Sequence, residues 1–167
     1  MHLMTMVVIV ALTAILQASA AMALPALEAR PDWVLVVVVA WSMLRGFEEG
    51  AALGATAGFF IDLTSGAPFG LYTVILATVG TAAAVGDAQS VRGNPSMLLA
   101  TAVLATIAFH GALMLGLQAL GWQALPPGRF LRLLFPTMVL NLLLLPIAFL
   151  VSERVYRMTT GWRQLEL

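Results

Sequence analysis

Long runs of apolar residues are the feature that most restricts how this chain can fold. Three of them extend over residues 3–24, 97–120 and 133–151, and each is close to the ~20 residues that cross the hydrocarbon core of a bilayer. Charged residues make up only 10% of the chain, against about 25% in an average soluble domain, so a water-soluble surface cannot be built. The sequence therefore predicts an all-α, polytopic integral membrane protein.

Further apolar segments raise the predicted number of transmembrane helices to about six. They cover residues 33–44, 50–61 and 69–86. The first run of the chain has an alternative interpretation as a cleaved signal peptide, because Ala-Met-Ala at 21–23 has the small-residue form of a cleavage site. No Lys or Arg precedes that run, however, as one would in a signal peptide. We therefore expect the first run to be retained as a transmembrane helix.

The segments 33–44 and 50–61 are short for membrane spans. About 12 apolar residues reach ~18 Å as a helix, against ~30 Å of hydrocarbon. They form either two short helices joined at the charged turn, or one long helix with Arg45, Glu48 and Glu49 near its middle. The single helix would bury charges at ~2.5 to 3.5 kcal/mol each, although Arg45 would pair with Glu49 at i+4. We favour two helices that form a hairpin.

The segments divide into one transmembrane domain, residues 1–151, and a short tail, residues 152–167. The tail contains Arg154, Arg157 and Arg163, and Arg is enriched on the cytoplasmic side of membrane proteins. With six spans, the amino terminus lies on the same side. Both termini are therefore predicted to be cytoplasmic.

Composition and motifs exclude several functional classes. The formal net charge is zero and cysteine is absent, so neither a basic surface for nucleic acid nor a thiolate metal site is predicted. No nucleophile with a neighbouring base, pair of carboxylates or phosphate-binding loop is visible. We expect no enzymatic activity and no cofactor.

A four-residue repeat is the most informative local pattern. Its members are Gly46, Gly50, Gly54, Gly58, Asp62, Gly66 and Gly70. On a helix, the glycines from 50 to 58 form a smooth stripe that drifts about 40° per step. Small residues let helices approach closely in lipid, so the stripe predicts either packing within this chain or an interface with a partner.

Three polar residues in or near apolar segments are candidates for function. Asp62 is a binding candidate because carboxylates at membrane depth are usually functional; alternatively it organises the turn by accepting hydrogen bonds from the backbone amides of residues 64–66. His110 is a candidate proton relay or the donor of one interhelical hydrogen bond. Asn141 is likewise a candidate, with one interhelical hydrogen bond as its structural alternative.

Several motifs together are similar to the MreD family of rod shape-determining membrane proteins. They are Pro31-Asp32-Trp33, Ala40-Trp41, Gly58-Phe59-Phe60-Ile61-Asp62-Leu63, Ser65-Gly66, Pro68, Gly70-Leu71-Tyr72, and Phe135-Pro136-Thr137 through Asn141 to Pro146. The resemblance extends over the whole chain in length and segment order. Its polar, glycine and proline positions are more specific than its leucines, so Asp32, Trp41, Pro136, Asn141 and Pro146 are taken as a structural motif of the family.

The resemblance implies a non-enzymatic scaffold of the cell-elongation complex in the bacterial inner membrane. It implies that MreC is bound, with MreB, RodA and a class B penicillin-binding transpeptidase in the wider complex that makes peptidoglycan. It also implies a fold similar to the substrate-binding subunits of energy-coupling-factor transporters. We expect helix packing to dock MreC, on the face of Gly50, Gly54 and Gly58, with Asp62 and the turn from Gly66 to Gly70 beside it.

A small-molecule-binding subunit of a transporter is the alternative interpretation. Its ligand would lie between the helices and contact Asp62, His110 or Asn141, since intramembrane ligand sites use such polar groups.

Overall fold

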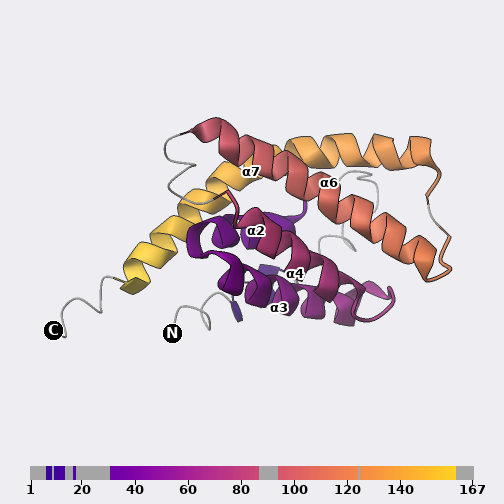
Figure 1. Ribbon diagram of the computed structural model, residues 1–167, viewed down its shortest axis with the longest axis horizontal. Helices are drawn as coiled ribbons and strands as arrows, with labels where there is room; N and C mark the ends of the chain where they lie inside the picture. The colour runs from indigo at the N-terminus through magenta and orange to yellow at the C-terminus, as the bar shows by residue number, and fades with distance from the viewer. Residues whose placement is uncertain are drawn as a thin grey trace.

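The computed structural model describes residues 7, 8, 10–13, 17, 31–86, 94–123 and 125–160. All regular structure in these ranges is helical, which confirms the all-α prediction. The main helices are α2 (Trp33–Arg45), α3 (Phe47–Ser65), α4 (Leu71–Ala83), α6 (Pro95–Ala119) and α7 (Pro127–Thr160) (Figure 1). Most of the first predicted span, the signal-peptide alternative, Arg92 and Arg163 lie outside the described residues.

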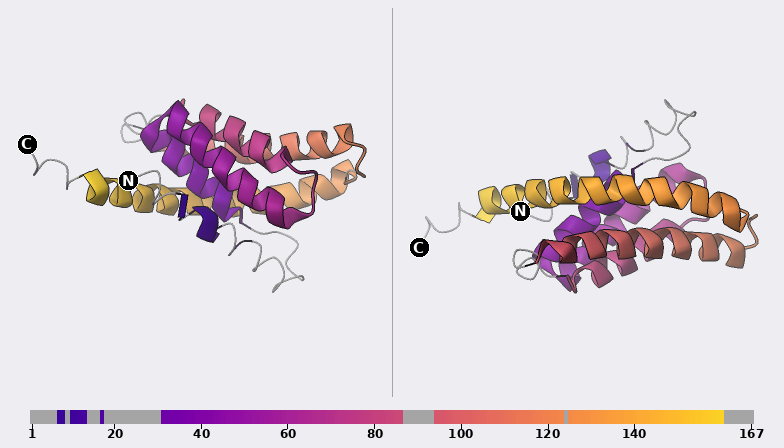
Figure 2. Two further views of the ribbon diagram at one scale, coloured as in Figure 1. Left: turned by 90° about the horizontal axis from the view of Figure 1, so that it is seen from below. Right: turned by 90° about the horizontal axis from the view of Figure 1, so that it is seen from above.

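Two long helices account for the strongest membrane signals. Ser96–Ala119 and Pro127–Met158 are long and apolar enough to cross a bilayer by length and composition. They form an antiparallel pair (Figure 2), and their outward faces carry exposed leucines such as Leu104, Leu115 and Leu143. Exposed leucine is expected where the solvent is lipid rather than water.

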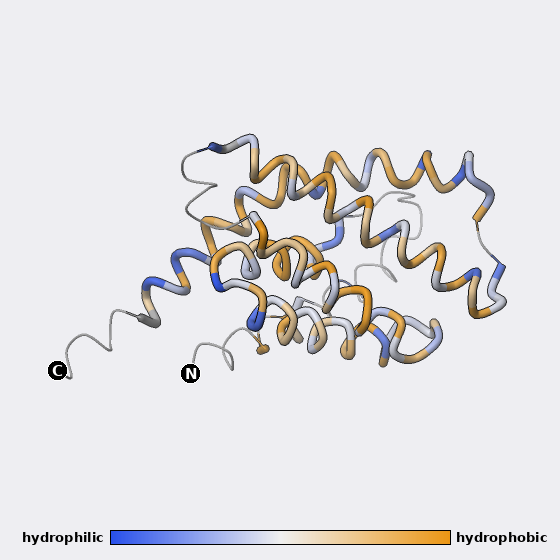
Figure 3. Tube along the Cα trace, in the orientation of Figure 1, coloured by the Kyte–Doolittle hydropathy of each residue, from blue (hydrophilic) through white to orange (hydrophobic). Residues whose placement is uncertain are grey.

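Helix α2 is the centre of the fold. It contacts α3, α4, α6 and α7, and its residues from Val34 to Met43 are buried with the single exception of Val37. Trp41 is fully buried. Most polar residues lie at helix ends and turns, while the helix middles are mainly apolar (Figure 3). An apolar central helix surrounded by other helices forms the core of the bundle.

The junction between α2 and α3 confirms the prediction of two helices. Gly46 separates them with a φ of +87°, a conformation that glycine adopts without steric cost. The 13 residues of α2 span only ~20 Å, so α2 is shorter than the hydrocarbon core. The 19 residues of α3 reach ~28 Å, because α3 includes the charged residues Glu48 and Glu49 in its first turn.

Helix α7 is longer at both ends than the predicted run 133–151. It begins at Pro127 and continues to Thr160, so residues 127–132, ahead of the predicted run, and the first part of the predicted tail are helical. Proline is favoured in the first turn of a helix because its missing N–H has no partner there. Near the other end, Arg157 Nη2 donates to Glu153 Oε1 at 2.8 Å, an i,i+4 pair that supports the helix.

Helix α7 bends along its length (Figure 1). Pro136 and Pro146 lie inside it, and each removes one backbone hydrogen bond and clashes with the preceding turn. The bend turns the last part of α7 towards the end of α2.

Candidate functional site

The glycine stripe of α3 faces α4. A Cβ atom added at Gly54 would lie 2.2 Å from the carbonyl oxygen of Leu76, and one at Gly58 would lie 2.4 Å from the carbonyl oxygen of Tyr72. These distances leave no room for a side chain, because the obstacle is backbone. The structure therefore agrees with the first interpretation of the stripe, which is packing between helices of this chain. The surface that we expected to receive a partner helix is covered by α4.

The same contact is reciprocal and extends to α2. A Cβ atom at Gly80 of α4 would lie 2.5 Å from the carbonyl oxygen of Gly50, and one at Gly50 would lie 2.6 Å from Ser42 Oγ of α2. Three helices therefore approach one another closely at this level, and the close approach depends on glycine at positions 50 and 80.

The last two glycines of the repeat belong to a turn rather than to the stripe. Gly66 has a φ of +68° at the end of α3, and Gly70 has a φ of +93° at the start of α4. Left-handed glycine is the usual way for a helix to end. A Cβ atom at either position would meet nothing within 4 Å, so backbone conformation and not space requires glycine there.

Asp62 is a helix cap for α4. Its carboxylate accepts hydrogen bonds from the backbone N–H groups of Tyr72 and Thr73, both at 3.0 Å, and from the Thr73 hydroxyl at 2.6 Å. The cap prediction was right in kind but wrong in its donors, which are not the amides of residues 64–66. The carboxylate reaches across the turn because the first N–H groups of α4 have no partner within that helix.

We expect Asp62→Ala to destabilise the protein by about 2 kcal/mol, at the upper end of the range for a lost helix cap. Denaturant unfolding of the purified protein in detergent would measure this loss. Thr64→Ala is the matched control, since the Thr64 hydroxyl binds only carbonyl oxygens of its own helix. Equal stability of the two variants would show that the cap contributes nothing.

A second polar group, the polar quartet, consists of the buried Thr106 and Asn141 and the partly buried Asp32 and His110. The backbone N–H of Asp32 donates to Asn141 Oδ1 at 2.9 Å, and Asn141 Nδ2 donates to Thr106 Oγ1 at 3.2 Å. His110 Nε2 lies 3.3 Å from Asp32 Oδ2. The quartet joins the start of α2 to the middle of α6 and α7, and it combines two sequence candidates, His110 and Asn141, with a motif residue, Asp32.

The hydrogen bonds of His110 define where its protons lie. Nδ1 is 3.0 Å from the carbonyl oxygen of Thr106, which can only accept, so Nδ1 carries a proton. Nε2 then approaches a carboxyl oxygen, and such an approach is favourable only if a proton lies between the two atoms. The Thr106 carbonyl oxygen and the Asp32 carboxyl group therefore face the two ring nitrogens of His110.

On α6, the quartet lies away from the carboxyl-terminal end of the helix. His110 precedes the last residue of α6, Ala119, by a distance of ~13 Å along the helix axis. Within the described ranges, no group of three His, Asp or Glu side chains lies close enough to hold a metal ion. The quartet is an interhelical hydrogen-bond network.

Trp41 belongs to a third polar group, at the opposite end of α2. Trp41 Nε1 donates to Glu49 Oε2 at 3.2 Å, and Arg45 Nε donates to the same oxygen at 2.9 Å. The Arg45 guanidinium also lies 4.8 Å from the centre of the Tyr156 ring. The pairing of Arg45 with Glu49 thus forms although the helix is broken between them. The contact of Tyr156 with Arg45 was not predicted from the sequence, because residues after 151 were assigned to a tail.

An open groove separates α4 from α6 on the outside of the bundle. Its volume is about 360 Å³, and its lining consists mainly of small side chains: Thr78, Val79, Ala82, Ala83, Leu104, Ala105, Ala108 and Ala112. Ala82 and Ala108 are exposed. Small side chains facing lipid permit the close approach of another helix. The groove was not predicted from the sequence, because alanine is too common in the chain for these positions to form a recognisable pattern.

Comparison with known proteins gives one family. The family model described as rod shape-determining protein MreD matches residues 1–159. No curated protein and no solved structure matches the chain.

Proposed function

The chain belongs to the rod shape-determining MreD family, a family of shape-determining membrane proteins rather than of enzymes, and we propose that it is a scaffold of the cell-elongation complex. Rod-shape determination follows from membership of the family. The finer proposal is that the chain acts by holding the transmembrane helix of MreC beside its own helices.

The α4–α6 groove is the proposed docking surface for the MreC helix. In lipid, helices associate by van der Waals packing, and small residues at the contact let the backbones approach. The glycines of α3 cannot serve, because α4 occupies them. The groove offers exposed small residues on two helices, Ala82 on α4 and Ala108 on α6. This observation carries the proposal.

The remaining parts of the assignment are also proposals. We propose a multi-pass protein of the bacterial inner membrane with about six spans, both termini in the cytoplasm, and a fold similar to the substrate-binding subunits of energy-coupling-factor transporters. The end of the bundle that holds Arg45, Arg154 and Arg157 would then face the cytoplasm, which agrees with the enrichment of Arg on that side. MreB, RodA and a class B transpeptidase would join through the wider complex.

Ala108→Leu is expected to abolish rod shape without unfolding the protein. Leucine would fill part of the groove and keep a partner backbone away. Residue 108 is exposed, so the larger side chain does not have to fit inside the bundle. Depletion of the protein in its host should turn rods into round cells, and Ala108→Leu should fail to restore rods at normal protein level.

Ala100→Leu is the control for this experiment. Ala100 is also an exposed alanine of α6 but does not line the groove, so its leucine variant should restore rods. Rods with both variants would rule out the groove as the docking surface, and round cells with both would point to a general effect of bulk on α6.

A further inference from the structure

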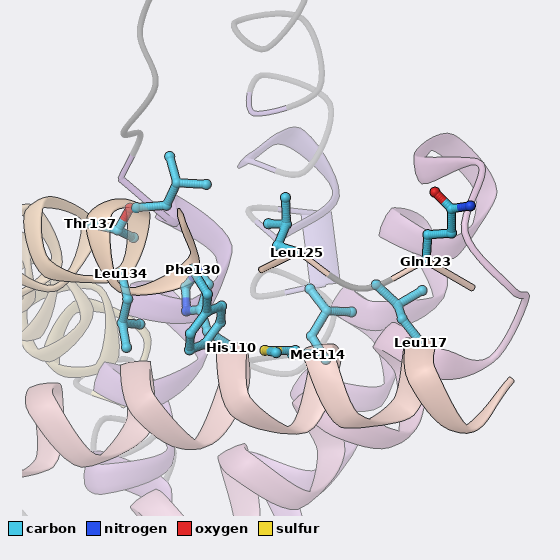
Figure 4. Close-up of a pocket in the computed structure, with 10 residues that line it drawn as sticks. His110, Met114, Leu117, Gln123, Leu125, Phe130, Leu134 and Thr137 are labelled. Atoms are coloured by element: carbon cyan, nitrogen blue, oxygen red, sulfur yellow. The ribbon is translucent and has the colours of Figure 1, made fainter. Parts of the chain in front are cut away.

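A cavity of about 170 Å³ lies between α6, α7 and the segment that connects them. In Figure 4, Met114 points from α6 towards Phe130 of α7, and Leu117 lies on the side of Leu125 and Gln123. His110 and Thr137 lie at one end, and Gln123 lies at the other. The cavity is separate from the α4–α6 groove and shares only His110 with the polar quartet.

Thr137 is a buried polar residue of the cavity lining whose hydroxyl has no hydrogen-bond partner among the described residues. Its residue is only 6% exposed, and no hydrogen bond of its hydroxyl exists within the described part of the chain. Seven other helical threonines in the described ranges donate to a carbonyl three or four residues earlier: Thr13, Thr56, Thr64, Thr78, Thr81, Thr101 and Thr106. A buried hydroxyl without a partner costs about 1–3 kcal/mol, and a ligand that hydrogen-bonds to Thr137 would remove this cost.

The electrostatics of the cavity favour a neutral ligand. His110 is the only titratable side chain in the described lining, and both of its ring nitrogens face partners, the Thr106 carbonyl and Asp32. No acidic or basic side chain other than His110 is present in the described lining to compensate a charged group. Burial of an uncompensated charge is costly, whereas a neutral hydroxyl can both donate to and accept from Thr137.

The size of the cavity limits what can enter. An engineered cavity of about 150 Å³ binds benzene, so about 170 Å³ accommodates one ring or an equivalent length of chain. We propose that this cavity binds a membrane-soluble alcohol, with its hydroxyl on Thr137 and its apolar part between Met114, Leu117, Phe130 and Leu134. The alcohol is either a small free molecule or the hydroxyl-bearing end of a neutral lipid.

Photolabelling of the full chain in phosphatidylcholine nanodiscs would test this site. The probe is a long-chain alcohol with a photoreactive diazirine near its hydroxyl, and the comparison probes are the matching hydrocarbon and the matching primary amine. We expect saturable labelling of residues 110–117 and 130–137 by the alcohol alone. Competition by unlabelled benzyl alcohol would identify a small free ligand, and competition by diacylglycerol a lipid.

Two variants connect the labelling to the cavity. Thr137→Val keeps the shape of the side chain but removes the hydroxyl, and should reduce alcohol labelling about fivefold, the equivalent of one hydrogen bond of ~1 kcal/mol. Leu134→Trp should fill the cavity and abolish labelling. Leu131→Trp, at a 61% exposed position of the same helix, should leave labelling intact and shows that the bulk of tryptophan is tolerated on α7.

The proposal is overturned by any of three results. They are equal labelling by the alcohol, hydrocarbon and amine; labelling of the Thr137→Val variant at the wild-type level; and labelling that neither benzyl alcohol nor diacylglycerol reduces. If Leu134→Trp does not fold, which size-exclusion chromatography would show, the Thr137→Val result decides alone. None of these readouts depends on MreC docking, so the two proposals fail separately.

Discussion

Replacement of Gly54 by alanine is expected to destabilise the protein by at least about 3 kcal/mol. The added methyl group would lie 2.2 Å from the Leu76 carbonyl oxygen and 3.0 Å from the Ala77 Cα atom, so α3 and α4 must move apart. Overpacking usually costs about 1–3 kcal/mol, and here the obstacle is backbone, which cannot change rotamer. Helix propensity alone would favour alanine by about 1 kcal/mol. A loss of stability in Gly54→Ala would therefore identify the clash between α3 and α4 as its cause.

Gly111→Ala is the matched control for this prediction. Gly111 is also a helical glycine, in α6, but a Cβ atom there would meet nothing within 4 Å. Alanine should therefore be neutral or slightly stabilising. Denaturant titration of both purified variants in the same detergent measures the difference. Equal stability of the two variants would mean that α3 and α4 do not pack through Gly54.

Replacement of Asn141 by leucine is expected to cost about 3 kcal/mol. Leucine has a similar shape but cannot accept from the Asp32 N–H or donate to Asp32 and Thr106. A buried donor left without its partner costs about 1–3 kcal/mol, while interhelical side-chain hydrogen bonds in membranes contribute ~0.6 kcal/mol on average. The buried N–H at the start of the central helix therefore supplies most of the loss.

Gln118→Leu is the control for Asn141→Leu. It makes the same kind of change from amide to leucine on α6, at an exposed position, and exposed substitutions usually stay within ±0.5 kcal/mol. Hydrogen exchange at the first amides of α2 should also increase in Asn141→Leu alone. Unchanged exchange there would contradict the quartet as the anchor of α2.

Sequence reasoning predicted the helical class because apolar run length is a local property. The break at Gly46 was also predictable, since a single helix would have buried Arg45, Glu48 and Glu49 in lipid. The ends of α7 were not, because Arg129, Arg132 and Glu153 are polar enough to suggest loop and tail. Within the helix, ion pairs between residues one turn apart, such as Glu153 with Arg157, stabilise these polar residues.

Individual residues of the sites were predictable from the sequence, but the contacts between them were not. Asp32 and Asn141 were selected separately, and their hydrogen bond joins residues 109 positions apart, which no local pattern can indicate. The glycine stripe was predictable as a close-contact surface, whereas its occupant was not, because a stripe fits equally well on a helix of the same chain or of a partner. Thr106 gave no sequence signal, and Thr137 belongs to the motif Phe135-Pro136-Thr137, which does not indicate that its hydroxyl lacks a partner.

The position of α4 changes where a partner must be sought. With the glycines of α3 covered, the close approach of another helix depends on the alanines of the α4–α6 groove. We therefore propose that MreC docks in the α4–α6 groove and not on the outer face of α7.

Single-cysteine crosslinking in the host membrane tests that claim most directly. The chain contains no cysteine, so each introduced thiol is unique. Cysteine at Ala82 or Ala108 of the groove should form a disulfide with a cysteine series along the MreC transmembrane helix, repeating every three to four positions. Cysteine at Leu143, an exposed residue of α7, should form none. Crosslinks from Leu143 without crosslinks from Ala82 or Ala108 would contradict the account.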